Sequence, residues 1–313
     1  MSNKCLYCCG DLTSGIDYHE KCSLIFFGSR QAPKLLYSYD QMSELAKHVV
    51  DRSISVPGVQ PKIFMSIVDG AVNKTDKRLT VIGVLGGNFI LKPPSPDYPE
   101  MPQNEHVSMR IAEAFGIWVV PSSLIRLQSG ELSYITRRID RTASGQKIHM
   151  LDMYQILEVF DKYKGSHEKI GKALGDYSIN TLLDKLFFFE LTLFCFLFGN
   201  NDMHLKNFSM INQLSGWVLS PAYDLLNVTL VLPGDTEELA LSMEGKKKKL
   251  SRQHFERFGE KLELSQKQIN GVFKRFNINI PKAVHWIDRS FLSEEFKAKY
   301  LAIVEDRYAK LYL

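Results

Sequence analysis

The sequence predicts an α+β fold with a small β-rich N-terminal lobe and a larger helical C-terminal lobe. In the first half, short segments rich in Val, Ile and Phe are separated by Asp-Gly and Gly-Gly turns, as is typical of strands. From about residue 152 onward, apolar residues recur at helical spacing instead. Strands that come first and helices that follow favour segregated layers over an alternating α/β sheet.

The N-terminal lobe combines a run of strands with two helices. Apolar residues at helical spacing predict a helix at 39–52, and the prolines and glycine of 53–62 predict a loop. A second helix is expected at 104–115, capped by Asn104 and ended by Gly116. The strands of this lobe are expected at 63–68, 78–84, 88–92, 118–120, 122–127 and 132–139.

The C-terminal lobe is expected to contain one strongly apolar helix among several amphipathic ones. Charged residues interrupt the apolar stretch 182–198, which leaves apolar runs well short of the ~20 residues that span a bilayer. It therefore predicts a buried helix rather than a membrane segment. The helices of this lobe are expected at 153–160, 168–174, 179–198, 252–262, 266–276 and 291–311.

The composition is that of a folded protein without a strong charge bias. Hydrophobic residues make up 45% of the 313 residues and charged residues 24%, which excludes an intrinsically disordered chain. The net charge of +4 is too small to indicate nucleic-acid binding. The first residues contain no apolar secretory signal, so we expect a cytoplasmic protein without membrane association, in which disulfides are uncommon.

Four of the five cysteines lie near the N-terminus, in a segment that contains a candidate zinc site. Cys5, Cys8, His19 and Cys22 form a C-x2-C…H-x2-C pattern. Tetrahedral Zn²⁺ prefers paired thiolate and imidazole ligands, and four protein ligands would make any zinc structural. The alternative is a set of reduced thiols without metal, and Cys9 adds a further candidate ligand.

The most distinctive segment is 199–207, G-N-N-D-M-H-L-K-N, directly after the most apolar predicted helix. Asp202 precedes Asn207 by five residues, which is the spacing of a phosphotransferase catalytic loop. There the aspartate orients or accepts the proton of the substrate hydroxyl, and the asparagine oxygen binds Mg²⁺. Asp224 follows a short predicted strand and is a second candidate metal ligand. The spacing alone is common by chance, but its position between a buried helix and Asp224 strengthens the prediction.

A phosphotransferase also needs a strand lysine for the phosphates and a helix glutamate that holds the lysine. Lys92 ends a predicted strand, and Glu105 lies at the start of the helix that follows. Taken singly, Lys92 could be a solvated strand-end lysine and Glu105 a carboxylate favoured by the helix dipole. Their order along the chain favours the functional roles. Residues 55–60 lie where a phosphate-covering loop belongs, although Gly58 is their only glycine.

Together these segments resemble the HipA-like toxin kinases. The motifs that carry the resemblance are S-V-P-G-V-Q-P-K (55–62), F-I-L-K-P (89–93), N-E-H (104–106), R-R-I-D-R (137–141), G-N-N-D-M-H-L-K-N-F (199–208) and P-A-Y-D (221–224). The likeness runs from about residue 52 to the C-terminus, and its most specific part is the D-x-H-x-K-N box. It implies a two-lobed protein-kinase-like fold. We expect the N-lobe at 31–137 and the helical C-lobe at 138–313, preceded by a separate Cys/His-rich, possible zinc-binding segment at 1–30.

The resemblance implies an ATP- and Mg²⁺-dependent Ser/Thr kinase and assigns its central residues. Asp202 would be the catalytic base, and Asn207 with Asp224 would hold Mg²⁺. Lys92 would bind the ATP phosphates, and Glu105 would orient Lys92.

Further residues are implied to contact the nucleotide. Backbone groups at 137–139 would meet the adenine, and His204 and Lys206 would lie beside the phosphates, unless the first only packs and the second is a solvated charge. Ser55 matches a loop serine whose autophosphorylation expels the loop and inactivates the kinase, and Ser53 is a second candidate. The full ATP-binding set implied is Lys92, Ser55, Val56, Gly58, Gln60, Arg137, Ile139, His204 and Lys206.

The resemblance also implies partners. Family members phosphorylate an aminoacyl-tRNA synthetase and are restrained by a HipB-like DNA-binding antitoxin, so no direct DNA contact is expected of this chain. The chain looks closest to the shorter HipT branch of HipBST systems, in which a separate small protein, HipS, replaces an N-terminal subdomain. The Cys/His segment departs from that pattern.

Two other interpretations remain open at this point. The D-x-H-x-x-N pattern also occurs in lipid and small-molecule kinases, and the lysine run 246–249 could dock anionic lipid or RNA if it is not simply a solvated turn. A pseudokinase interaction module is the non-enzyme alternative, but it would have no need of Lys92, Asp202, Asn207 and Asp224 together.

Overall fold

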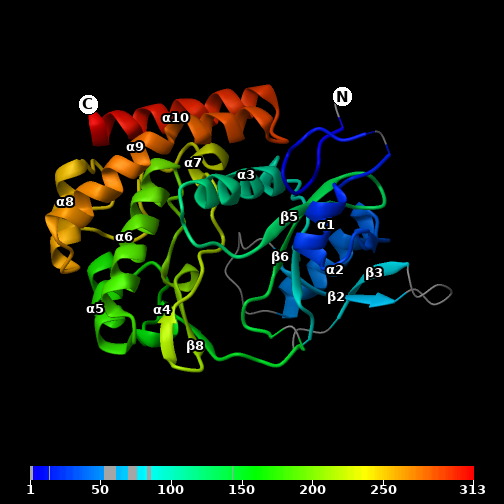
Figure 1. Ribbon diagram of the computed structural model, residues 1–313, viewed down its shortest axis with the longest axis horizontal. Coiled ribbons are helices and arrows are strands. Elements are labelled where there is room, and N and C mark those ends of the chain that lie inside the picture. The colour runs from blue at the N-terminus through cyan, green and yellow to red at the C-terminus, as the bar shows by residue number, and fades with distance from the viewer. Residues whose placement is uncertain (1–2, 14, 53–60, 70–75, 83–85, 143) are drawn as a thin grey trace. The chain divides into compact units, whose positions relative to one another are not determined.

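The computed structural model describes the chain apart from residues 1–2, 14, 53–60, 70–75, 83–85 and 143 (Figure 1). The chain forms two compact units, which are described separately. Unit 1 comprises Met1–His106, Val120–Lys147 and Arg289–Phe291, and unit 2 comprises Val107–Val119, Ile148–Asp288 and Leu292–Leu313. Unit 1 contains a six-stranded sheet and unit 2 is mainly helical, which confirms the predicted α+β class.

The sheet of unit 1 places β4 next to its centre, in the order β1-β3-β2-β4-β6-β5. Neighbouring strands of this sheet pair antiparallel, except that β1 pairs parallel with β3. The strands are β1 (Lys34–Leu35), β2 (Ile63–Asp69), β3 (Lys77–Val81), β4 (Phe89–Lys92), β5 (Ser122–Arg126) and β6 (Leu132–Arg137). Lys92 is the last residue of β4 and lies opposite Tyr134 of β6, so its backbone is fixed by pairing.

The core of unit 1 forms on one face of this sheet. Alternate residues of β2 and β4 are buried, as the two-residue period of a strand requires. Helix α1 (Glu20–Phe27) adds Phe26 and Phe27 to the same cluster, where both rings contact Phe89. This helix was not predicted, because its eight residues lie within the cysteine-rich segment and give little periodicity. Gly28 ends it in the left-handed conformation with φ of 74°.

Helix α2 (Tyr39–Arg52) matches its predicted bounds, whereas α3 (Met101–Ala114) begins three residues earlier than expected. Pro102 lies in the first turn of α3, where a missing N–H leaves no helical hydrogen bond unmade. Asn104 is therefore buried inside the helix and is not its cap, and its main-chain N–H donates to Glu100.

Unit 2 is built around α6 (Thr181–Leu197), of whose 17 residues 12 are buried. Its buried polar groups have partners: the Asp184 carboxylate accepts from the main chain of Leu219 at 2.7 Å, and Glu190 pairs with Arg275 at 2.7 Å. This satisfies the hydrogen-bonding requirement of buried polar atoms. The other helices of this unit are α4 (Met153–Ile156), α5 (His167–Tyr177), α7 (Val228–Val231), α8 (Arg252–Lys261), α9 (Gln266–Arg289, whose last residue belongs to unit 1) and α10 (Glu294–Tyr312).

A three-stranded antiparallel sheet in unit 2 supports the segments on either side of it. It consists of β7 (Met150–Asp152), β8 (Ser209–Gln213) and β9 (Gly216–Leu219), in that order. Strand β8 begins two residues after Asn207, and β9 ends five residues before Asp224. The sheet therefore anchors both predicted metal ligands.

Three other predicted elements differ most in extent. Helix α9 continues past the expected end at 276 and through Pro281, because Asn279, Ala283 and Ile287 keep a buried face beyond it. Helix α4 stops at Ile156, ahead of a left-handed residue at Glu158. The expected strand at 118–120 is reduced to one isolated bridge, in which Val119 pairs with Ala222.

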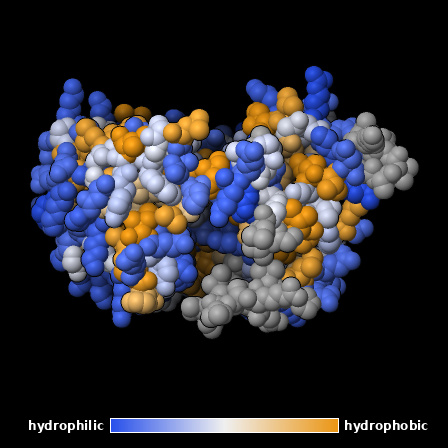
Figure 2. All heavy atoms as spheres, turned by 90° about the horizontal axis from the view of Figure 1, so that it is seen from below, coloured by the Kyte–Doolittle hydropathy of each residue, from blue (hydrophilic) through white to orange (hydrophobic). Residues whose placement is uncertain are grey.

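The surface drawn in Figure 2 carries hydrophobic residues in separate patches among hydrophilic ones. Within the described ranges, no helix combines the length and the apolar character that crossing a bilayer requires.

We predict that Phe115→Ala lowers the free energy of unfolding by about 3–5 kcal/mol, since the ring is fully buried and truncation leaves a cavity. Its ring meets Phe198 at 5.1 Å and Phe276 at 5.2 Å, both nearly edge-on. Urea unfolding followed by circular dichroism measures the change. The control is Phe160→Ala, whose side chain is 99% exposed and whose loss should cost less than about 0.5 kcal/mol.

We also predict that His167 makes the protein less stable in mild acid. Burial lowers the pKa of His167 to about 4, because the ring lies against Phe188 and is 1% exposed. The unfolded chain binds its proton at higher pH than the folded chain does, so stability falls as the pH drops from about 6.5 towards 4.

The free energy of unfolding of the parent protein should therefore fall between pH 7 and pH 5. In His167→Gln the fall should be smaller by about 2 kcal/mol. Urea titrations at the two pH values measure this difference. The exposed His285 serves as control through His285→Gln, and an equal loss in both variants and the parent would contradict the assignment.

Candidate active site

The predicted catalytic loop leaves the end of α6 through a sharp turn at Gly199. Gly199 has a φ of 68°, and a Cβ at this position would lie 2.7 Å from Oδ1 of Asn227. The same Asn227 oxygen accepts the main-chain N–H of Leu230 and so caps α7. Only glycine satisfies both the backbone conformation and the available space.

Inside the loop, the main-chain carbonyl of Asp202 holds the residues that follow. It accepts the N–H of His204 at 2.8 Å and the side-chain amide of Asn207 at 3.1 Å. Because the Asn207 nitrogen is engaged, its Oδ1 is the oxygen left to act as a metal ligand. Asn207 is 8% exposed and lies in a short 3₁₀ helix, η1 (Leu205–Asn207), which restricts its rotation.

Asn200 connects the two predicted acidic residues through its side chain. Its Oδ1 accepts the main-chain N–H of Asp202 at 3.4 Å, and its Nδ2 donates to the main-chain carbonyl of Asp224 at 3.3 Å. Asn200 is 1% exposed. Sequence reasoning gave it no role, since Asp224 is 24 residues away and no spacing rule links the two.

Asp224 has a left-handed backbone with φ of 61°. This conformation is uncommon for residues other than glycine, although aspartate tolerates it better than most. The segment from β9 to Asp224 is held by Ala222, whose N–H donates to the Trp118 carbonyl at 2.7 Å. Backbone strain at a metal-binding candidate is consistent with a functional constraint.

His204 lies in the electrostatic field of both acidic residues. Burial lowers the pKa of His204 to about 4, while Asp202 and Asp224 act in the opposite direction. The imidazole is therefore neutral at pH 7. The Asn200 side chain, which bonds to the main chain of both residues, brings Asp202 and Asp224 into one neighbourhood of unit 2.

Tyr163 is a second residue that the sequence did not reveal. Its hydroxyl donates to Oδ1 of Asp202 at 2.7 Å, and its ring meets the edge of His204 at 5.2 Å. Burial and the Asp202 charge raise the pKa of Tyr163, so the phenol stays protonated and remains a donor. It lies 39 residues before Asp202 in a segment without a recognisable motif.

Lys206 is exposed, and its Nζ lies 4.6 Å from the centre of the Tyr154 ring. Its main-chain carbonyl accepts the hydroxyl of Tyr223 at 3.1 Å. The cation–π contact gives Lys206 a defined position at the surface.

In unit 1, the two other predicted catalytic residues form a buried ion pair. Lys92 Nζ lies 2.6 Å from Glu105 Oε1, and the two residues are 4% and 1% exposed. Lys92 is supplied by the end of β4 and Glu105 by the second turn of α3. Burying two charges is costly, and the pair offsets that cost only through close geometry. Such a pair is better explained by a need for a fixed charge than by stability.

The predicted hinge residues lie in and just after β6. The main-chain N–H of Arg137 donates to the Pro121 carbonyl at 2.9 Å, so it is already engaged. The Arg137 guanidinium is directed at the end of α1, where it donates to the carbonyls of Phe26 at 2.7 Å and Ile25 at 3.4 Å. Ile139 is half-buried and follows the end of the strand.

The R-R-I-D-R motif forms a compact charge cluster. Arg138 makes a bidentate contact with Asp140 at 2.8 and 2.6 Å, and Arg141 adds a contact at 2.7 Å. Burial alone would raise the pKa of Asp140, but the two guanidinium groups outweigh it and lower the pKa. The motif thus fixes the chain immediately after β6.

The remaining predicted residues fall into two groups. Ser53, Ser55, Val56, Gly58 and Gln60 lie outside the described residues. Cys5, Cys8, His19 and Cys22 do come together, with their ligand atoms within 4.8 Å of one another.

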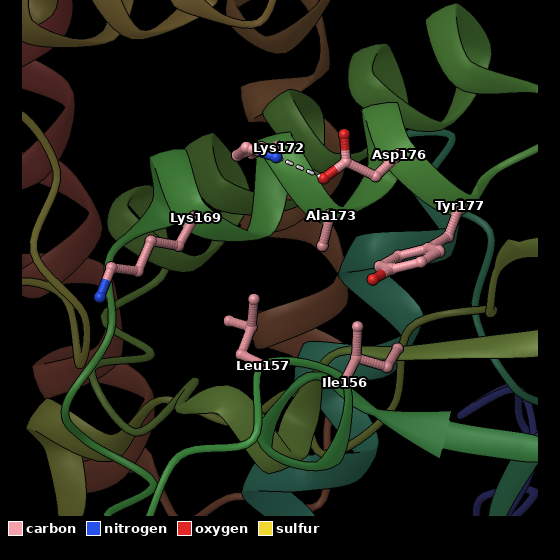
Figure 3. A pocket seen from close by; sticks show the side chains of 7 residues that line it. All are labelled: Ile156, Leu157, Lys169, Lys172, Ala173, Asp176 and Tyr177. Carbon is pink, nitrogen blue, oxygen red and sulfur yellow. Dashed lines mark hydrogen bonds and ion pairs between the residues drawn. The ribbon is translucent and has the colours of Figure 1, made fainter.

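A small pocket between α4 and α5 is lined by none of the predicted site residues (Figure 3). Its volume is about 140 Å³, below the ~300 Å³ of typical small-molecule sites. The Lys172–Asp176 ion pair of 2.5 Å lies across its rim. The residues that line it are Ile156, Leu157, Lys169, Lys172, Ala173, Asp176 and Tyr177.

Comparison with known proteins identifies relatives among kinases. Two relatives bear the name Putative kinase: one from Haemophilus influenzae is 28% identical over 211 residues, 63% of this chain and 59% of its own length. The other, Y4dM from Sinorhizobium fredii, is 36% identical over 200 residues, 59% of this chain and 48% of its own. The Ser/Thr-protein kinase toxin HipA of Shewanella oneidensis is 26% identical over 200 residues, 56% of this chain and 44% of its own. The matched region spans about half the length of these relatives.

The solved structure of that Shewanella oneidensis HipA, in complex with HipB and operator DNA, has the same fold. The TM-score is 0.68 at 22% identity, over 85% of this chain and 70% of HipA. This confirms the predicted HipA-type fold. The model of the HipA-like C-terminal domain family matches residues 54–284, which include the predicted lysine, glutamate and catalytic loop. The chain therefore belongs to the HipA-like C-terminal domain family.

Proposed function

We propose that this protein is an ATP- and Mg²⁺-dependent Ser/Thr protein kinase and a HipA-type toxin, with Asp202 as its catalytic base. The observation that carries the proposal is the linkage of Asp202, Asn207 and Asp224 by the Asn200 amide and the Asp202 carbonyl. This linkage supports the proposal, because phosphoryl transfer requires a carboxylate base close to oxygen ligands for the metal ion.

The reaction follows from the roles of these residues. The proton of the acceptor serine or threonine passes to a carboxylate oxygen of Asp202 as the hydroxyl oxygen attacks the γ-phosphorus of ATP. The bond from that phosphorus to the β,γ-bridging oxygen breaks, and ADP leaves. The Tyr163 hydroxyl, 2.7 Å from Oδ1, fixes the orientation of the Asp202 carboxylate.

Magnesium fits the ligands that the chain offers. Asn207 Oδ1 and the Asp224 carboxylate are oxygen ligands of the kind that Mg²⁺ prefers. When bound, the ion would neutralise charge on the β- and γ-phosphates. Neutral His204 leaves the negative charge of this neighbourhood available for a cation.

Lys92 supplies the positive charge for the α- and β-phosphates. The Glu105 carboxylate at 2.6 Å holds the ammonium group in place while it is buried. Backbone groups of 137–139 are the proposed adenine contacts, and Ser55, Val56, Gly58 and Gln60 the proposed phosphate loop. His204 and Lys206 are proposed to lie beside the phosphates.

The proposal extends to regulation and partners. Ser55 is the proposed autophosphorylation site, with Ser53 as the second candidate. The relative from Shewanella oneidensis is solved together with HipB and operator DNA, which supports a HipB-like antitoxin as a partner. A HipS-like small protein and an aminoacyl-tRNA synthetase substrate are the further partners proposed, in the manner of the HipT branch.

Asp202→Asn should reduce autophosphorylation by about 10³-fold, because the amide cannot accept the hydroxyl proton. Labelled ATP and Mg²⁺ with the purified chain, followed by mass spectrometry of the Ser55 peptide, measures this. Asp176→Asn is a matched control on the exposed face of α5. Transfer to phosphoinositide vesicles instead of protein would favour a lipid kinase, and ATP binding without ADP formation would favour a pseudokinase.

Asn200→Leu should lower kcat by about 10²-fold with a small change in the KM for ATP, because Asp202 and Asp224 lose their common support. The Mg²⁺ concentration for half-maximal activity should rise in the same variant. Steady-state kinetics over a Mg²⁺ series measures both. Asn212→Ala, at an exposed position of β8, is the control. A folded Asn200→Leu protein with unchanged kcat would refute the positioning role.

A further inference from the structure

The Cys/His segment brings four potential ligands together in unit 1, and the proposed kinase reaction makes no use of them. The Sγ atoms of Cys5, Cys8 and Cys22 and a ring nitrogen of His19 lie within 4.8 Å of one another. Among the described residues, no other group of three or more His, Cys, Asp and Glu side chains lies close enough together to hold one ion. All three thiols are free, so no disulfide competes for them.

The orientation of His19 is fixed from outside the cluster. Its Nε2 lies 3.0 Å from the Asp11 carbonyl, to which it donates. The other nitrogen, Nδ1, then carries the lone pair, and it lies 3.5 Å from Cys8 Sγ and 3.7 Å from Cys22 Sγ. A ligating histidine typically gives its second N–H to a carbonyl or carboxylate in this way. This observation is independent of the cysteine spacing.

The backbone of residues 5–10, called the knuckle below, forms a tight hydrogen-bonded turn around the first two cysteines. The N–H of Cys5 donates to the Gly10 carbonyl at 2.8 Å, and the N–H of Cys9 donates to the Cys5 carbonyl at 2.9 Å. Cys9 has a left-handed φ of 55°. A Cβ at Gly10 would lie 3.3 Å from both Cys8 Sγ and His19 Cε1, closer than nine in ten real Cβ contacts. The main chain of Gly10 therefore packs closely against the side chains of Cys8 and His19.

We propose that Cys5, Cys8, His19 and Cys22 bind one structural Zn²⁺ ion through three thiolates and Nδ1. Binding would release the protons of the three thiols, and the four ligands would complete a tetrahedron with no position open for catalysis. Soft sulfur ligands with one imidazole favour zinc over magnesium or calcium. Cys9 lies outside the set of ligand atoms, although it is fully buried next to Cys8.

The knuckle is bonded to two elements of unit 1. The Leu6 carbonyl accepts the N–H of Leu124 in β5 at 3.0 Å and the hydroxyl of Ser123 at 3.1 Å. The Tyr7 carbonyl lies 3.1 Å from Nε2 of His106, which is fully buried in α3. A metal at the knuckle would therefore fix carbonyl acceptors for both β5 and α3.

The contact with His106 extends the role of the metal to the buried ion pair. His106 directly follows Glu105, whose carboxylate holds Lys92 at 2.6 Å. If the knuckle loosens, this part of α3 loses the hydrogen bond of His106 to the Tyr7 carbonyl, next to Glu105. This second step rests on the proposed kinase function, whereas zinc binding itself does not.

Zinc content tests the site without any measurement of activity. The untagged full-length protein, purified from zinc-supplemented cells, should contain about one zinc per chain by plasma mass spectrometry. Cys8→Ser and His19→Gln should fall below about 0.1 zinc per chain, while Cys9→Ser should keep the parent content. Cys9→Ser is a close match because it changes a buried thiol next to the ligand Cys8.

A second measurement covers the case in which the ligand variants fail to fold. The parent protein, loaded with Co²⁺ in place of zinc, should show the visible absorption of tetrahedral cobalt with thiolate charge transfer, and a zinc chelator should lower its melting temperature. A parent protein that lacks zinc and gives no tetrahedral cobalt spectrum would overturn the proposal. Equal zinc in the parent, Cys8→Ser and His19→Gln would overturn it as well. Normal zinc content without kinase activity would instead count against the proposed function alone.

Discussion

The two hydrogen bonds of the Asn200 side chain are the constraint on which the arrangement of unit 2 depends. They join the main chain of Asp202 to that of Asp224, two residues that the sequence separates by a 3₁₀ helix and a hairpin. The buried helix α6 delivers Asn200 to this position, and the β8–β9 hairpin returns the chain to it. A polar loop thus follows directly on a buried apolar helix. Burial of its polar groups would be unfavourable without these hydrogen bonds.

In unit 1, the corresponding constraint is the position of the Lys92 ammonium group at the end of β4. The register of β4 with β6 fixes the backbone of Lys92, and Glu105 from α3 fixes its side chain. Neither charge is well solvated, so the pair contributes little net stability, and loss of either partner would remove the close ion pair from a charge that stays buried. The Tyr7 carbonyl lies against His106, the residue after Glu105, and Phe26 and Phe27 of α1 pack on Phe89 at the start of β4.

Sequence reasoning was most successful where a pattern is local. The period of β2 and the length of α6 were readable because burial imposes a repeat, and the Cys/His spacing predicted a cluster that the fold does form. It failed where tertiary contacts decide. Helix α9 runs through Pro281 because its later residues are buried, which no propensity indicates. The contacts of Asn200 and Tyr163 join segments 24 and 39 residues apart, so only the folded chain reveals them.

The turn at Gly199 makes two distant positions interdependent during evolution. The space that a side chain at 199 would need is filled by the Asn227 amide, which at the same time caps the start of a separate helix. A shorter residue at 227 would open that space but uncap the helix, and the backbone at 199 would still disfavour a side chain. Sequence change at this corner of the protein would need several coordinated substitutions, so we expect it to drift more slowly than the helices around it.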